Sequence, residues 1–155
     1  MKWVTRQGVK FDRSASAWLI RRFIDPEATF AYLEGEEIAA AVAEGAQAFH
    51  NYAWTGNRAD LPADRVNLAT LISTYGLAEA HPALTLFAES VRNGERSGRA
   101  GTGAENEGLW AICNGMSLLA HGDDAELVER MMPVYDALYA YCEHRLGGGH
   151  GWTGG

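Results

Sequence analysis

The chain has 155 residues, of which 47% are hydrophobic and 21% charged, as is typical of one globular domain with its own core. A net charge of −7 argues against nucleic-acid binding, because domains that bind phosphates need a basic face. The N-terminus turns polar at once, and no apolar run reaches the roughly 18 to 20 residues of a membrane span. We therefore expect a cytoplasmic protein, with neither nucleic acid nor a membrane as its partner.

The first third of the chain predicts a strand–helix–strand unit. The helix is capped by Asp12 or Ser14 and ends near Asp25-Pro26, because a residue before proline resists the helical conformation. The expected elements are a strand over 2–5, a helix over 12–24, a strand over 29–33, a helix over 36–44 and a third strand over 46–50.

The remainder of the chain predicts helices separated by loops. Asp123, followed by Glu126, is typical of a helix N-cap, and Pro133 is expected to kink that helix or to begin a new one. We expect an irregular loop over 51–64, helices over 65–75, 82–92, 104–120 and 123–146, a glycine-rich mobile loop over 93–103 and a flexible tail over 147–155.

Together these patterns predict a helix-rich α+β fold. A small three-stranded β layer with an N-terminal βαβ unit would be followed by a bundle of four to five helices, in a single domain over residues 1–146. The two cysteines, Cys113 and Cys142, lie among apolar residues at helical spacing and are expected to be buried thiols.

Several stretches of the sequence carry a resemblance to a known family: Trp3-Val4-Thr5-Arg6, Asp12-Arg13, the run from Trp18 to Ala28, Glu107-Gly108-Leu109, the run from Gly115 to Leu119, Asp123-Asp124 and the run from Val134 to Ala140. In these stretches the chain resembles the C-terminal domain of ChrB-type chromate resistance proteins. The resemblance implies a role in resistance to chromate. Full-length members carry an N-terminal regulatory region, and this chain begins where the C-terminal domain would begin. A DNA-binding regulator is therefore not the expected role.

The middle of the chain departs from this family pattern. The family has a His, a Cys and an acid where this chain has residues 54–68, and it places a His after the Asp-Asp pair where this chain has Ala125. If those family residues hold a metal or a cofactor, this chain has lost it. The five histidines of the chain form no metal-binding spacing either, so we predict no metal site, and the sequence does not indicate which cofactor, if any, would bind.

The best candidate for a site is a cluster of charged residues around the first helix, with Glu107 added from a later one. Chromate, sulfate and phosphate are tetrahedral dianions, which suit guanidinium groups and the free N–H groups of a helix N-terminus. The residues predicted to bind a small molecule or an oxyanion are Asp12, Arg13, Trp18, Arg21, Arg22 and Glu107. In the alternative, the arginines only make structural ion pairs, with Asp12, Asp25 or Glu107 as partners, and Glu107 only favours its helix dipole.

Three functions remain open at this stage. The leading one is a domain that binds a small ligand or an oxyanion during metal or oxyanion stress. The second is a metal- or cofactor-dependent enzyme of unknown reaction, in which Glu107 and a histidine take part. The third is a non-catalytic interaction module that forms a homo-oligomer through its last helices.

Overall fold

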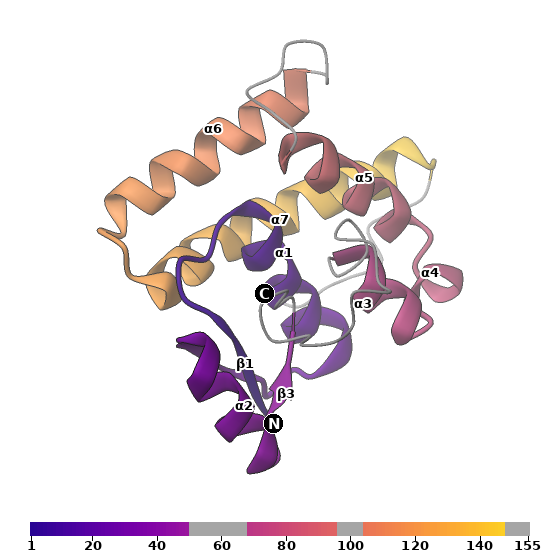
Figure 1. Cartoon of the computed structure of the whole chain (residues 1–155). Helices are drawn as coiled ribbons and strands as arrows, with labels where there is room; N and C mark the ends of the chain where they lie inside the picture. The colour runs from indigo at the N-terminus through magenta and orange to yellow at the C-terminus, as the bar shows by residue number, and fades with distance from the viewer. Residues whose placement is uncertain (50–67, 96–103, 148–155) are drawn as a thin grey trace.

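The computed structural model describes residues 1–49, 68–95 and 104–147 (Figure 1). Its strands are β1 (Lys2–Arg6), β2 (Thr29–Leu33) and β3 (Gln47–Ala48). Seven α-helices and one π-helical turn accompany the strands in this part of the chain: α1 (Phe11–Leu19), η1 (Ile20–Ile24), α2 (Gly35–Ala43), α3 (Leu68–Thr74), α4 (Leu77–Ala80), α5 (Ala83–Glu95), α6 (Ala104–Leu119) and α7 (Asp124–Arg145).

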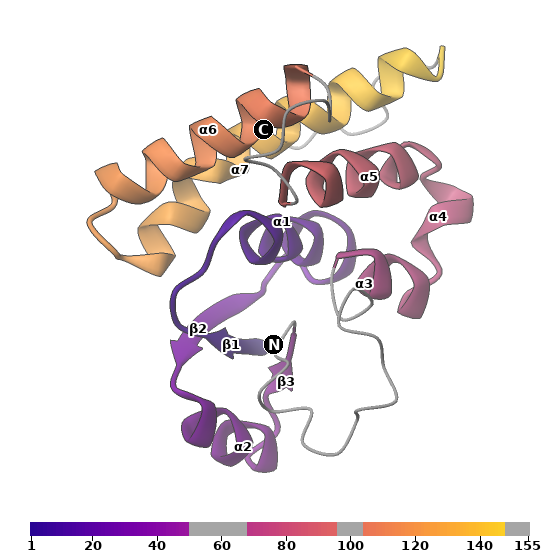
Figure 2. The same ribbon diagram turned by 45° about the horizontal axis from the view of Figure 1, so that its top comes forward.

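The three strands form one parallel sheet in the order β2-β1-β3. The central strand β1 pairs with β2 from Lys2 opposite Thr29 to Arg6 opposite Leu33. Figure 2 shows the layers: α2 lies below the sheet, α1 lies above it, and α5, α6 and α7 lie beyond α1. Two strand–helix–strand crossovers thus build the sheet, and the predicted helix-rich α+β fold with an N-terminal βαβ unit is confirmed.

The first helix is the centre of the molecule, because its side chains are buried on nearly all sides. Trp18 is fully buried and stacks on Phe87 of α5 at a centroid distance of 4.4 Å. Tyr135 of α7 is also fully buried, and its hydroxyl donates to the carbonyl oxygen of Phe11 at 2.9 Å. This core explains why the sequence around Trp18 is apolar all round the helix.

The helix predicted over 12–24 is divided in the structure. Its last turn, η1, is π-helical, and the N–H of Asp25 donates to the carbonyl oxygen of Ile20 at 2.7 Å, five residues back. Such turns insert one extra residue into a helical path and are frequent at functional positions. Arg21 and Arg22 both lie in this turn.

The long C-terminal helix α7 continues past Pro133, so the predicted start of a new helix there is wrong, whereas the predicted kink stays a prediction. Proline removes one helix hydrogen bond, which orphans a carbonyl one turn earlier. Pro133 lies on the exposed side of α7, where water can satisfy that carbonyl. The predicted N-cap is confirmed, because the Asp123 side chain accepts a hydrogen bond from the Glu126 N–H at 3.1 Å.

Helix α5 extends to Glu95, beyond the predicted end at residue 92. Gly94 permits this close packing, because a Cβ atom at this position would overlap the ring of Phe11. The short helix α4 was not predicted, and β3 is shorter than the expected strand over 46–50. The predicted loop over 51–64 and most of the loop over 93–103 lie outside the described residues. So does the tail from residue 148 onward, and the division into a domain over 1–146 and a tail stays a prediction.

Candidate functional site

Arg13 binds the loop that precedes its own helix. Its guanidinium donates to the carbonyl oxygen of Arg6 at 2.5 Å and to that of Gly8 at 2.6 Å. The first carbonyl lies at the end of β1 and the second in the loop between β1 and α1. Arg13 therefore fixes the path of the chain into α1.

Asp124 holds the same loop from the other side. One carboxylate oxygen accepts from the N–H of Gly8 at 3.0 Å, and the other accepts from the N–H of Val9 at 2.8 Å. The loop thus has its carbonyls bound by a guanidinium and its N–H groups bound by a carboxylate that lies 115 residues further along the chain. Charge-assisted hydrogen bonds of this kind are stronger than neutral ones. They therefore fix the backbone immediately before Lys10.

Trp18 and Arg22 meet at one carboxylate, that of Asp136 on α7. The Trp18 indole N–H donates to Oδ1 at 2.7 Å, and Arg22 donates through Nε and Nη2 to the two oxygens, both at 3.1 Å. The side chains of Arg22 and Asp136 are each 20% exposed. This forked ion pair neutralises the arginine at the edge of the core.

Arg21 makes a separate and more exposed ion pair with Glu129, in which Nη1 of Arg21 lies 2.7 Å from Oε1 of Glu129. The Glu129 side chain is 63% exposed, so the pair lies at the surface. The guanidinium also lies over the ring of Phe30 in β2, 5.1 Å from its centroid. Arg21 therefore bridges the sheet and α7.

The six predicted site residues do not converge on one point. Trp18 and Arg22 come together at Asp136, Arg13 lies at the other end of α1, and Glu107 is in the first turn of α6. The arginine partners that we expected did not include Asp136 or Glu129, which belong to the last helix. A signal for Asp136 was present, because it is an acid between the buried residues Tyr135 and Leu138.

Asp25, one of the expected arginine partners, binds the start of the chain instead. Its carboxylate accepts from the indole N–H of Trp3 at 2.9 Å and pairs with the N-terminal ammonium of Met1 at 3.1 Å. The Trp3 hydrogen bond, together with the ammonium charge, holds the pKa of Asp25 below its usual value. Asp25 thereby fixes the first strand to the end of η1.

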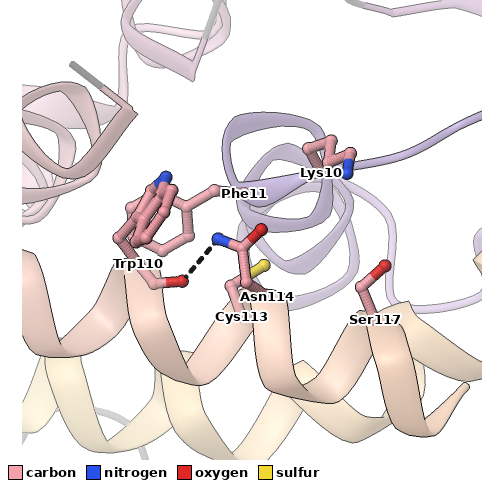
Figure 3. Close-up of a pocket in the computed structure, with 6 residues that line it drawn as sticks. All are labelled: Lys10, Phe11, Trp110, Cys113, Asn114 and Ser117. Atoms are coloured by element: carbon pink, nitrogen blue, oxygen red, sulfur yellow. Dashed lines mark hydrogen bonds between the residues drawn. The ribbon is translucent and has the colours of Figure 1, made fainter. Parts of the chain in front are cut away.

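A cavity of about 90 Å³ lies between the start of α1 and one side of α6 (Figure 3). It is lined by Lys10, Phe11, Trp110, Cys113, Asn114 and Ser117. The Asn114 amide donates to the carbonyl oxygen of Trp110 at 2.8 Å, which leaves its own oxygen exposed to the cavity (Figure 3). The sequence did not predict this pocket. Its lining comes from two segments, residues 10–11 and residues 110–117, which are about a hundred residues apart in sequence.

With this geometry in hand, the chain can be compared with known proteins. The family profile described as "ChrB, C-terminal domain" matches residues 3–142. The chain belongs to the ChrB C-terminal domain family. The chain is similar to Protein ChrB of Cupriavidus metallidurans, with 34% identity over 140 residues, which are 90% of this chain and 40% of that protein. The chain thus spans less than half the length of this relative. No solved structure matches the chain.

Three further observations concern metal binding, membrane spans and the cysteines of this ChrB-type domain. Within the described ranges, no three His, Cys, Asp or Glu side chains gather as they would around a metal ion. None of the helices described has the length and apolar character that crossing a bilayer requires. Cys113 and Cys142 are both buried thiols outside any disulfide, as predicted, and burial raises the pKa of Cys142 to about 11.

Proposed function

We propose that this domain binds a small oxyanion in the chromate-resistance response of the cytoplasm, and that the ligand enters the cavity between α1 and α6. Membership in the ChrB C-terminal domain family supports the chromate context. The lining of the cavity supports this position for the ligand, because it combines one cation with several neutral hydrogen-bonding groups.

The observation that carries this proposal is the set of unused donors around the cavity. Among the residues described, the Lys10 ammonium, the Trp110 indole N–H and the Ser117 hydroxyl have no hydrogen-bond or ion-pair partner. All three are hydrogen-bond donors, which are the groups that an oxyanion accepts from. Lys10 is also the N-cap of α1, whose first turn has no side-chain cap, so the helix dipole favours an anion near this end.

The size of the cavity limits the ligand. A volume of about 90 Å³ is well below the roughly 300 Å³ at which pockets for drug-sized ligands begin. A tetrahedral oxyanion fits this range and a nucleotide cofactor does not. We therefore expect sulfate and phosphate to compete with chromate.

The ligand-binding role of the arginines stays a prediction, and the geometry favours another role for them. Arg13, Arg21 and Arg22 each donate to acceptors of the protein itself, so an oxyanion would have to displace those acceptors. We propose that Arg13, together with Asp124, instead holds the loop that presents Lys10. Asp12, Trp18 and Glu107 would then act through packing and helix position.

The test is a calorimetric titration of the purified chain with chromate, sulfate and phosphate. Lys10→Ala should weaken binding at least tenfold, because it removes the cation of the cavity. Lys2→Ala is the matched control, since Lys2 is the other lysine of the chain, is exposed on β1 and lies outside the cavity. Ser117→Ala should cause a smaller loss.

Two outcomes would overturn the proposal. If none of the three oxyanions binds the wild-type chain at millimolar concentration, the oxyanion function is wrong. If Arg21→Ala abolishes binding while Lys10→Ala leaves it unchanged, the ligand binds at the arginines and the cavity is not the site. Arg21 suits this comparison because its partner Glu129 is largely exposed and the fold should survive.

A further inference from the structure

We infer that α6 is the interface through which two copies of this chain associate, with the two helices antiparallel about a two-fold axis. This inference does not depend on the proposed ligand, because it concerns the opposite side of α6 from the cavity. Figure 1 shows α6 at the outer edge of the helix bundle, with α7 on its inner side.

The outer face of α6 is apolar although it is exposed. It consists of Gly108, Ala111, Ile112, Gly115, Leu118 and Leu119, which recur at helical spacing. Leu118 is 77% exposed, Leu119 58% and Ile112 48%. Helices on the surface of a soluble domain normally carry charges on the outer side, and this one carries none between Glu107 and Asp123. A face of this kind indicates a surface that another molecule covers.

The outer face of α6 is complementary in shape to a second copy of itself. A Cβ atom built at Gly108 or at Gly115 would meet nothing within 4 Å, so each glycine is a hollow. An antiparallel pair centred midway between residues 113 and 114 puts Ile112 opposite Gly115 of the partner subunit. The same pairing puts Leu119 opposite Gly108 of the partner subunit. Each large side chain therefore meets a hollow, and two-fold symmetry repeats both contacts.

The polar groups at the two ends agree with this arrangement. The N-terminal end of α6 carries the exposed Glu105, and the C-terminal end is followed by the exposed His121. Antiparallel pairing places Glu105 beside His121 of the partner subunit, and it also opposes the two helix dipoles favourably. A parallel pair would instead place the acidic ends side by side.

The area predicts how strong the association is. A helix of 16 residues is about 24 Å long and about 10 Å wide, so its face is well below the roughly 800 Å² per partner of a standard interface. The dimer should therefore dissociate on dilution. Sedimentation velocity from low micromolar to near-millimolar protein should show the mass rising from 16.8 kDa toward twice that value.

A pair of substitutions tests the register. Gly115→Ile fills the hollow and should give a monomer over the whole concentration range, with the helix content intact. Adding Ile112→Gly to that variant exchanges the two partners, so each two-fold contact again joins one isoleucine and one glycine, and the dimer should return. Ala39→Leu enlarges an exposed residue of α2 and should leave the association unchanged.

The second contact gives an independent copy of this test if Ile112→Gly weakens the helix too far. Gly108→Leu should abolish the dimer, and the addition of Leu119→Gly should restore it. A wild-type chain that stays at 16.8 kDa up to near-millimolar concentration would overturn the inference. So would a Gly115→Ile variant that still dimerises, because the interface would then lie elsewhere.

Discussion

Replacing Asp136 with Ala should destabilise the domain more than any other change to its surface charges. The carboxylate of Asp136 accepts one hydrogen bond from Trp18 and two from Arg22. Trp18 is fully buried, so water cannot replace the lost acceptor of its indole N–H. Arg22 is 20% exposed and can turn toward water.

The magnitude follows from these two environments. Leaving the buried indole N–H unbonded costs about 1–3 kcal/mol. Losing a partly exposed ion pair costs about 1 kcal/mol after screening by solvent. Asp136→Ala should therefore lower the free energy of unfolding by about 2–4 kcal/mol, which corresponds to a fall in Tm of about 5–15 °C for a domain of this size. Asp136→Asn keeps an acceptor for Trp18 and should lose about half as much.

Urea unfolding followed by Trp fluorescence and circular dichroism measures this loss. Glu129→Ala is the matched control, because Glu129 lies on the same helix and pairs with the neighbouring arginine while it is 63% exposed. It should cost at most about 1 kcal/mol. If Asp136→Ala and Glu129→Ala lowered the free energy of unfolding equally, the reasoning would be wrong, because the buried hydrogen bond of Trp18 would then contribute nothing beyond an exposed ion pair.

Three further predictions concern single residues. Because the folded-state pKa of Asp25 is lowered, its stabilisation is present above the unfolded value near 3.8 and is lost as the pH falls through the folded value. The stability lost in Asp25→Asn, measured by urea unfolding at several pH values, should thus be full at neutral pH and vanish in acid. Gly94→Ala should cost about 1–3 kcal/mol by overlap with Phe11, whereas Gly35→Ala, with open space around it, should be neutral in the same assay. Cys142, whose pKa burial raises to about 11, should resist iodoacetamide at pH 8 in the native chain and react in urea; rapid native labelling would contradict its burial.

The order and type of most elements could be predicted from the sequence because periodicity and caps are local signals. The alternation over 29–33 and the cap at Asp123 both depend on neighbours within four residues. The π-helical turn could not be predicted, because an amphipathic pattern over a few residues looks the same with and without the extra residue. Gly94 predicted a loop, yet the residue serves a close contact with Phe11 that only the packed structure shows.

The candidate site was harder to predict because its contacts join distant parts of the chain. The sequence showed that buried arginines need partners, but nothing local pointed from Arg22 to an acid 114 residues away. The cavity has the same origin, since Lys10 and Ser117 meet only when α6 packs beside α1. The family resemblance could be seen from the sequence, since it rests on runs of adjacent residues.

Helices α6 and α7 differ in where they carry charged residues, and this difference indicates different roles. Three acids of α7 bind groups within the first 22 residues: Asp124 binds the loop after β1, Glu129 binds Arg21, and Asp136 binds Trp18 and Arg22. These contacts join the βαβ unit to the helix bundle, so substitutions that remove them should lower the free energy of unfolding. Helix α6 has no charge along its middle, and its two sides face a cavity and solvent. Apart from Cys113, the residues of α6 on those two sides lie outside the buried core. Substitutions of those residues should therefore alter ligand binding or association while the free energy of unfolding of the monomer stays nearly constant.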